Sequence, residues 1–152
     1  MVIEASLSKD QFIRLAILRH FQRIHFYIFA MAAAGFTAWA LLRGPLVFLL
    51  VGWIPFLVYI LAGIIAAVKD GNNKNNPVFL STRYEFTPKG VSISNAQGKS
   101  QLEWHDFISW KVMVKCYTLT LSSGAVLAIP QSAVSGTQLA KFEGLLRKHI
   151  GG

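Results

Sequence analysis

His105 and Asp106 are adjacent, and this pairing is the one in the chain closest to catalytic chemistry. A carboxylate beside an imidazole can hold the ring in the tautomer that takes a proton from a nucleophile. No supporting motif marks a serine or cysteine as that nucleophile. Aspartate is also a favoured capping residue, so we expect Asp106 to cap a short helix that follows it. The sequence therefore predicts a structural role for this pair.

Two further histidines, His20 and His25, flank the start of a long apolar stretch, where a histidine can ligate a haem or a chlorophyll-type metal. Because they are five residues apart, they would lie on different faces of a helix. We expect ordinary hydrogen-bonded histidines at this position. Contact of either ring with a pigment or haem of a partner stays open.

The other signatures of catalysis and metal binding do not occur in the sequence. Cys116 is alone, which excludes an intrachain disulfide and a cysteine metal site. There is no phosphate-binding glycine loop, paired-carboxylate motif or two-histidine zinc spacing. We therefore expect a protein that is not an enzyme and holds no metal or cofactor.

Two apolar blocks, residues 26–42 and 46–68, dominate the chain and are separated by Arg43-Gly44-Pro45. As helices, these 17 and 23 residues would be roughly 26 Å and roughly 35 Å long. The hydrocarbon core of a bilayer is about 30 Å thick, and a helix satisfies its own backbone hydrogen bonds there. Neither block contains the carboxylates of a proton relay or ion pathway. Residues 25–68 are therefore predicted to form a two-helix transmembrane hairpin.

The segments on either side of this hairpin have a different character. Residues 1–24 combine a short strand over residues 1–5 with a basic amphipathic helix, and Ser8 and Gln11 have capping-box spacing at the start of that helix. Residues 69–77 are polar and rich in turn formers, which is typical of a linker. The remaining residues, 78–152, are predicted to form a separate soluble domain.

The net charge is +8, with 15 basic and seven acidic residues, and several of the basic residues flank the hairpin. The predicted membrane-surface basic residues are Arg14, Arg19, Arg23, Lys69 and Lys74. The turn between the spans carries only Arg43, so the positive-inside rule places both termini in the cytoplasm. Anionic lipid headgroups attract such charge, whereas no nucleic-acid-reading motif accompanies it. We expect lipid contact and no nucleic-acid partner.

Small residues recur along both spans and indicate helix packing. The predicted helix-packing interface consists of Ala30, Ala34, Gly35, Ala38, Gly52 and Gly63. Small side chains let another helix approach closely, so that van der Waals contacts hold the pair. Two interpretations stay open: the hairpin packs on itself, or a partner membrane protein uses the face that remains.

After residue 78 the apolar period changes to two, as in β-strands. Six short strands separated by tight turns are predicted, and one of them is expected to run from Trp110 through Cys116. A C-terminal helix follows, with Ser135 and Gln138 at capping-box spacing and Gly151 as its stop. Its apolar stripe consists of Leu139, Phe142, Leu146 and Ile150. The predicted fold class is thus a membrane α-helical hairpin plus an α+β domain, an antiparallel sandwich or barrel capped by one helix.

Four lysines of this domain are predicted to point outward or to lie in turns. They are Lys89, Lys99, Lys111 and Lys115. They form either a solvated face or a patch that presses on anionic lipid.

Several of these features together resemble bacterial YcxB-like membrane proteins. They are the basic segment and hairpin, Trp104 with the short turn to Ile108, the paired strands that follow, and the Ile129-Pro130 step before the last helix. The resemblance implies a C-terminal domain similar to the pleckstrin-homology fold, a bent antiparallel barrel capped by one helix. Such a fold usually has seven strands, so the strand over residues 1–5 could supply the seventh.

The resemblance implies architecture more than activity, because the YcxB-like family has no well-defined activity. Gln131 and Ser132 follow the Ile129-Pro130 step, at positions where relatives often carry basic residues. This difference argues against phosphate binding next to that step. We expect a non-catalytic accessory or scaffold subunit of the bacterial cytoplasmic (inner) membrane, bound to a larger integral membrane complex or to copies of itself. The alternative is a stand-alone lipid- or peptide-binding sensor that uses the basic face of the C-terminal domain.

Overall fold

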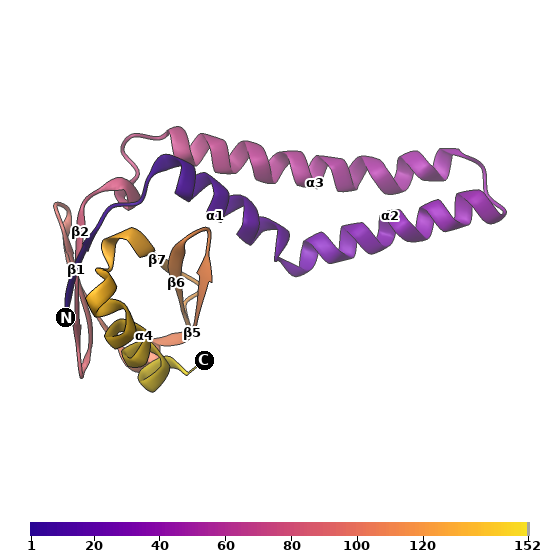
Figure 1. Ribbon diagram of the computed structural model, residues 1–152. Coiled ribbons are helices and arrows are strands. Elements are labelled where there is room, and N and C mark those ends of the chain that lie inside the picture. Colours follow the sequence, from indigo (N-terminus) through magenta and orange to yellow (C-terminus); the bar gives the residue numbers. More distant parts are fainter. Residues whose placement is uncertain (152) are drawn as a thin grey trace. The chain divides into compact units, whose positions relative to one another are not determined.

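The computed structural model describes residues 1–151, and the chain divides into two compact units. One unit combines Met1–Gln11 with the chain from Lys74 onward, and the other is Phe12–Asn73. Four α-helices and seven strands occur in the described residues (Figure 1). Each unit has its own packing.

Helix α1 (Lys9–Phe21) begins at the predicted capping box. The backbone N–H of Gln11 donates to Ser8 Oγ at 3.2 Å, and the N–H of Ser8 donates to Gln11 Oε1 at 3.3 Å. These bonds satisfy donors that the first turn of a helix otherwise leaves without partners. The predicted start is confirmed, whereas the helix ends at Phe21, before the predicted end at residue 24.

Helices α2 (Ile24–Leu42) and α3 (Val47–Asn72) correspond to the two predicted spans. Both are long and apolar enough to cross a membrane, and only 11% of the most apolar stretch of each is buried inside the molecule. The core helix of a soluble protein would be mostly buried, so this exposure favours lipid surroundings. Helix α3 continues past residue 68 to Asn72. The predicted linker at 69–77 is correspondingly shorter, with a 3₁₀ turn at Pro77–Phe79.

Helices α2 and α3 lie side by side as an antiparallel hairpin (Figure 1). The rings of Phe29 and Tyr59 stack across it with centroids 5.1 Å apart. Trp53 Nε1 donates to Thr37 Oγ1 at 2.9 Å, and that hydroxyl donates in turn to the carbonyl of Ala33 at 2.7 Å. The Trp53 and Thr37 side chains thus find their partners within the hairpin, as an apolar environment requires.

The strands form two antiparallel sheets, with orders β1-β2-β3-β4 and β5-β6-β7. They are β1 (Val2–Ala5), β2 (Thr82–Thr87), β3 (Gly90–Asn95), β4 (Gly98–Glu103), β5 (Phe107–Met113), β6 (Cys116–Leu121) and β7 (Val126–Pro130). Strand β1 pairs with β2 from Val2↔Glu85 to Ala5↔Thr82, so the predicted N-terminal strand joins the domain. The two sheets share no strand, and the domain is therefore not a closed barrel.

The prediction of one strand from Trp110 through Cys116 is wrong. Strand β5 ends at Met113 and β6 begins at Cys116, which pairs with Met113 across a two-residue turn. Val114 and Lys115 both have positive φ, 51° and 56°, as the mirror-image hairpin turns require. Such turns usually carry Asn or Gly, and a valine continues the apolar alternation instead. The turn therefore cannot be recognised from the pattern of apolar residues.

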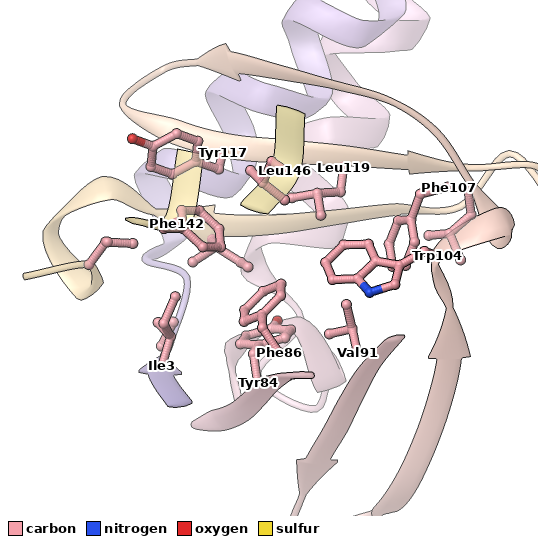
Figure 2. Close-up of a cluster of buried hydrophobic side chains, with 14 residues drawn as sticks. Ile3, Tyr84, Phe86, Val91, Trp104, Phe107, Tyr117, Leu119, Phe142 and Leu146 are labelled. Atoms are coloured by element: carbon pink, nitrogen blue, oxygen red, sulfur yellow. The ribbon is translucent and has the colours of Figure 1, made fainter. Parts of the chain in front are cut away.

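Side chains from both sheets and from helix α4 (Gly136–Ile150) form one core (Figure 2). Phe142 and Leu146 of α4 are fully buried, as the predicted stripe requires. The Phe142 ring meets Phe86 of β2 and Tyr117 of β6 edge-on, with centroids 5.0 and 5.1 Å away. Helix α4 is thus held by contacts with one strand from each sheet.

The ends of α4 follow the prediction only in part. Gly151 follows the last helical residue with φ +77°, a conformation that glycine adopts freely. The predicted capping box at Ser135 is wrong, because the Gln138 N–H donates to the Ser135 carbonyl at 2.9 Å rather than to its hydroxyl. The Ser135 hydroxyl lies instead 3.3 Å from Thr137 Oγ1. A neighbouring hydroxyl competes here for the capping side chain.

Burial raises the pKa of Tyr84 and Tyr117 above the ordinary value of 10.0. For Tyr117, the hydrogen bond to Glu143 raises the pKa further, since its hydroxyl donates to Glu143 Oε1 at 2.8 Å. For Tyr84, a hydrogen bond with Thr82 opposes the effect of burial. Both phenols therefore stay protonated in the folded domain at a pH where an unfolded tyrosine ionises.

We expect the free energy of unfolding of this domain to fall as the pH rises above 10.0, the unfolded value. Between that pH and the raised folded pKa values, the unfolded state binds fewer protons and is favoured increasingly. An alkaline titration that follows tyrosinate absorbance and circular dichroism together checks this. Tyr117→Phe should reduce the pH slope, and ionisation of both buried phenols near their ordinary pKa without unfolding would contradict the expectation.

Candidate functional site

In the structure, Asp106 of the His105–Asp106 pair caps a turn of the backbone. Asp106 Oδ2 accepts from the Glu103 N–H at 2.9 Å and closes the 3₁₀ turn Trp104–Asp106. The His105 side chain is 76% exposed, with Nδ1 3.2 Å from Glu103 Oε2 and Nε2 3.4 Å from Asp106 Oδ1. Asp106 thus caps the turn that it ends, which corrects the expectation that it caps a following helix.

The predicted small-residue interface is divided between different surfaces. Gly52 is buried against α2, where a Cβ would lie 2.8 Å from Phe36 Cβ. On α2 itself, Ala33 and Ala40 are the buried alanines. Ala34, Gly35 and Ala38 are exposed, Ala30 is half-buried, and Gly63 is buried elsewhere, against α1. The hairpin's own contact therefore leaves the stripe Ala34-Gly35-Ala38 uncovered within the described chain.

The four predicted surface lysines are exposed but do not form one face. Lys89 lies in the β2–β3 turn and Lys99 pairs with Ser94 near the other end of β3. Lys111 lies on β5 and Lys115 in the β5–β6 turn, so both belong to the second sheet. The lysines are spread over two sheets.

The five basic residues predicted at the membrane surface lie close to the end of the hairpin where α2 begins and α3 ends. All five side chains are exposed, and Arg19 also has a contact with another residue. Arg14 and Arg19 lie on α1, Arg23 lies between α1 and α2, Lys69 lies in the last turns of α3, and Lys74 follows α3.

His20 holds α1 against α3. Its Nε2 lies 3.0 Å from the carbonyl oxygen of Tyr59, so this nitrogen carries the proton. The two rings stack with centroids 4.3 Å apart, and the Tyr59 hydroxyl donates to the His20 carbonyl at 3.3 Å. A Cβ at Gly63 would overlap the imidazole, so only glycine leaves room for it. The predicted hydrogen-bonded histidine is confirmed for His20, while His25 is exposed.

A groove opens between α1 and α3 beside this contact and has a volume of about 440 Å³. We call it the α1–α3 groove. Its lining consists of Ala16, His20, Arg23, Tyr59, Ala62, Gly63, Ala66, Ala67 and Asp70. Most of these side chains are small, and two of them carry opposite charges. The arrangement is suited to binding a charged or zwitterionic group.

Sequence reasoning missed this groove. Its two walls come from segments some 40 residues apart, as the 39-residue separation of His20 and Tyr59 shows. The signal that was present is the cluster Ala62-Gly63 and Ala66-Ala67 late in the second span, because small residues on a helix admit a close neighbour. Which helix packs against these small residues depends on the direction of the chain between the end of α1 at Phe21 and the start of α2 at Ile24.

The buried Cys116 thiol and the histidines do not assemble into a metal site. Burial raises the pKa of Cys116, which keeps the thiol protonated and unreactive. Within residues 1–151, no group of three histidine, cysteine or carboxylate side chains could hold a metal ion. Comparison of the chain with models of protein families, with curated proteins and with solved structures finds no match.

Proposed function

We propose that this chain is a non-catalytic accessory or scaffold subunit, anchored in a membrane by the α2–α3 hairpin and bound there to a larger integral membrane complex. The observation that carries the proposal is the uncovered stripe Ala34-Gly35-Ala38 on α2. The hairpin packs through a different face, with Ala33 and Gly52 at its contact. A Cβ at Gly35 would meet nothing within 4 Å. A second helix could therefore approach this face closely.

The pairing of strands supports a topology with both termini on one side. Strand β1 precedes the hairpin and β2 follows it, yet the two strands pair with each other. A hairpin that crosses a bilayer twice must then return the chain to the side from which it started. The basic residues near this end, including Arg14 and Lys69, favour the cytoplasmic side of the bacterial inner membrane.

The soluble unit has the features that a pleckstrin-homology-like domain would show. It contains antiparallel sheets of four and three strands and one C-terminal helix whose Phe142 and Leu146 enter the common core. A domain of this kind next to the hairpin would offer a second surface to the partner complex. The YcxB-like family supplies the same combination of hairpin and domain by resemblance.

We expect Ala34→Leu to reduce recovery of the partner complex about tenfold or more when the chain is purified from its own membranes in mild detergent. Leucine would hold the partner backbone away from α2, and the contacts of closely packed small residues would be lost. Quantitative mass spectrometry of the purified material measures the ratio. Ala32→Leu is the matched control, since Ala32 is exposed on another side of the same helix. Equal recovery for wild type and both variants would contradict the proposal.

The sensor alternative is less well supported, because Lys89 and Lys99 lie on one sheet while Lys111 and Lys115 belong to the other. The same purification discriminates the two functions. A stoichiometric large partner supports the accessory role. A lone monomer or dimer that binds anionic vesicles in a salt-sensitive way, and loses this with Lys111→Glu and Lys115→Glu, supports the sensor.

A further inference from the structure

We propose that the α1–α3 groove binds the headgroup of an amine-bearing phospholipid, with Arg23 holding the phosphate and Asp70 holding the ammonium. The proposal rests on membrane insertion of the hairpin, and it concerns a face different from the α2 stripe. It also differs from a general attraction of basic residues to anionic lipid, because an acidic residue takes part.

The order of the two charges along the groove follows from how the helices run. Helix α1 is antiparallel to the end of α3, since a Cβ at Gly71 would meet Ile13 and one at Gly63 would meet His20 (Figure 1). Arg23 therefore lies toward the end of the groove where the lining begins at Tyr59 on α3. Asp70 lies at the opposite end.

The two ends of the groove lie at different depths in the proposed membrane. Lys69 and Asp70 are the first charged residues after the apolar run of α3 and mark the outer side of the headgroup region, whereas Arg23 is the last charged residue before the apolar run of α2 and marks its inner side. Gly63 precedes Lys69 by six residues, which is roughly 9 Å along a helix. Arg23 follows His20, which contacts Gly63, so the arginine enters the groove from the deeper end. A phospholipid carries its charges in the same order, with the phosphate nearer the acyl chains and the ammonium farther out.

Neither charge is compensated by the protein. Within residues 1–151, no ion pair forms at Arg23 or at Asp70. Arg23 lies at the start of the α2 span, where the headgroup region meets the apolar core, and a phosphate there can accept two parallel hydrogen bonds from its guanidinium. An ammonium donates three hydrogen bonds and suits the carboxylate at the outer end. The proposal assigns the phosphate of one headgroup to Arg23 and its ammonium to Asp70, since both residues line the same groove.

The space between the charges fits a headgroup. Ala62, Ala66 and Ala67 line the α3 side, and their small side chains leave the groove open. The volume of about 440 Å³ lies within the range of natural ligand sites. The stacked pair His20–Tyr59 fixes the wall beside it, so the groove is already formed before a lipid binds.

The test is native mass spectrometry of the full chain in neutral detergent, titrated separately with dioleoyl phosphatidylethanolamine, phosphatidylcholine and phosphatidylglycerol. We expect phosphatidylethanolamine to bind about tenfold more tightly than phosphatidylcholine, whose methylated amine has no N–H for Asp70. Asp70→Asn should remove this preference. Arg23→Gln should weaken all three lipids, because all three carry a phosphate.

Matched controls separate these effects from unspecific changes. Asp10→Asn makes the same change on α1 outside the groove, and Arg43→Gln does so at the far end of the hairpin; neither should alter binding. Ala66→Leu should fill the groove and weaken binding without any change of charge. Circular dichroism confirms that each variant remains helical.

Three results would overturn the proposal: equal binding of phosphatidylethanolamine and phosphatidylcholine by the wild type, stronger binding of phosphatidylglycerol, or an unchanged preference in Asp70→Asn. Extraction of the chain from membranes by alkaline carbonate would instead contradict insertion of the hairpin. Failure of the lipid site is therefore distinguishable from failure of the proposed function, which the α2 stripe variants test.

Discussion

Phe142→Ala is expected to lower the free energy of unfolding of the unit that contains both sheets and α4 by about 3–5 kcal/mol. Phe142 has no exposed surface, and its ring contacts Phe86 and Tyr117, one from each sheet (Figure 2). Alanine would leave a cavity at the point where α4 meets both sheets. A loss of this size is a large part of the stability of a small domain.

Urea unfolding of the full chain in detergent, followed by the fluorescence of Trp104 and Trp110, measures this loss against the background of the hairpin tryptophans. Lys141→Ala is the control, since Lys141 is the exposed neighbour of Phe142 on α4 and its replacement should change stability by less than about 0.5 kcal/mol. A loss below about 1 kcal/mol for Phe142→Ala would show that α4 is not part of the common core.

Gly52→Leu is expected to separate α2 from α3 and to cost about 1–3 kcal/mol or more of hairpin stability. A Cβ at this position would lie 2.8 Å from Phe36 Cβ and 3.2 Å from the Ala33 Cα. The second of these atoms belongs to the backbone, so a rotation of side chains cannot relieve the overlap. The helices would have to move apart along their contact.

Thermal melting in detergent, followed by circular dichroism and by the fluorescence of Trp53, measures the effect. Trp53 reports directly because its hydrogen bond to Thr37 crosses the hairpin. Gly35→Leu is the matched control, since a Cβ there meets nothing within 4 Å and the melting temperature should stay unchanged. Equal shifts for both variants would mean that Gly52 has no special place in the contact.

The elements that depend on neighbouring residues could be predicted from the sequence alone. The capping box of Ser8 and Gln11 joins residues three apart, so its spacing is visible in the sequence and the bonds form as expected. The apolar blocks are long enough to define α2 and α3 without knowledge of their partners. At Ser135 the same spacing failed, because a second hydroxyl, that of Thr137, was available to the capping side chain.

Positions whose role depends on a distant partner could not be predicted in this way. Val114 extends the alternation of β5, and only the pairing of Met113 with Cys116 reveals a turn.

A helix that is apolar on every side carries no contrast to mark its packed face, so the sequence could not distinguish Ala33 from Ala34 on α2. The sequence by itself determined two apolar helices, the basic residues that flank them, and an antiparallel domain with one C-terminal helix. Only the tertiary structure decided that α1 runs back along α3, with His20 over Gly63 and Arg23 and Asp70 at opposite ends of one groove. Local hydrogen bonds and hydrophobic length are properties of a segment, whereas the face of a helix that meets another is decided by how both can pack.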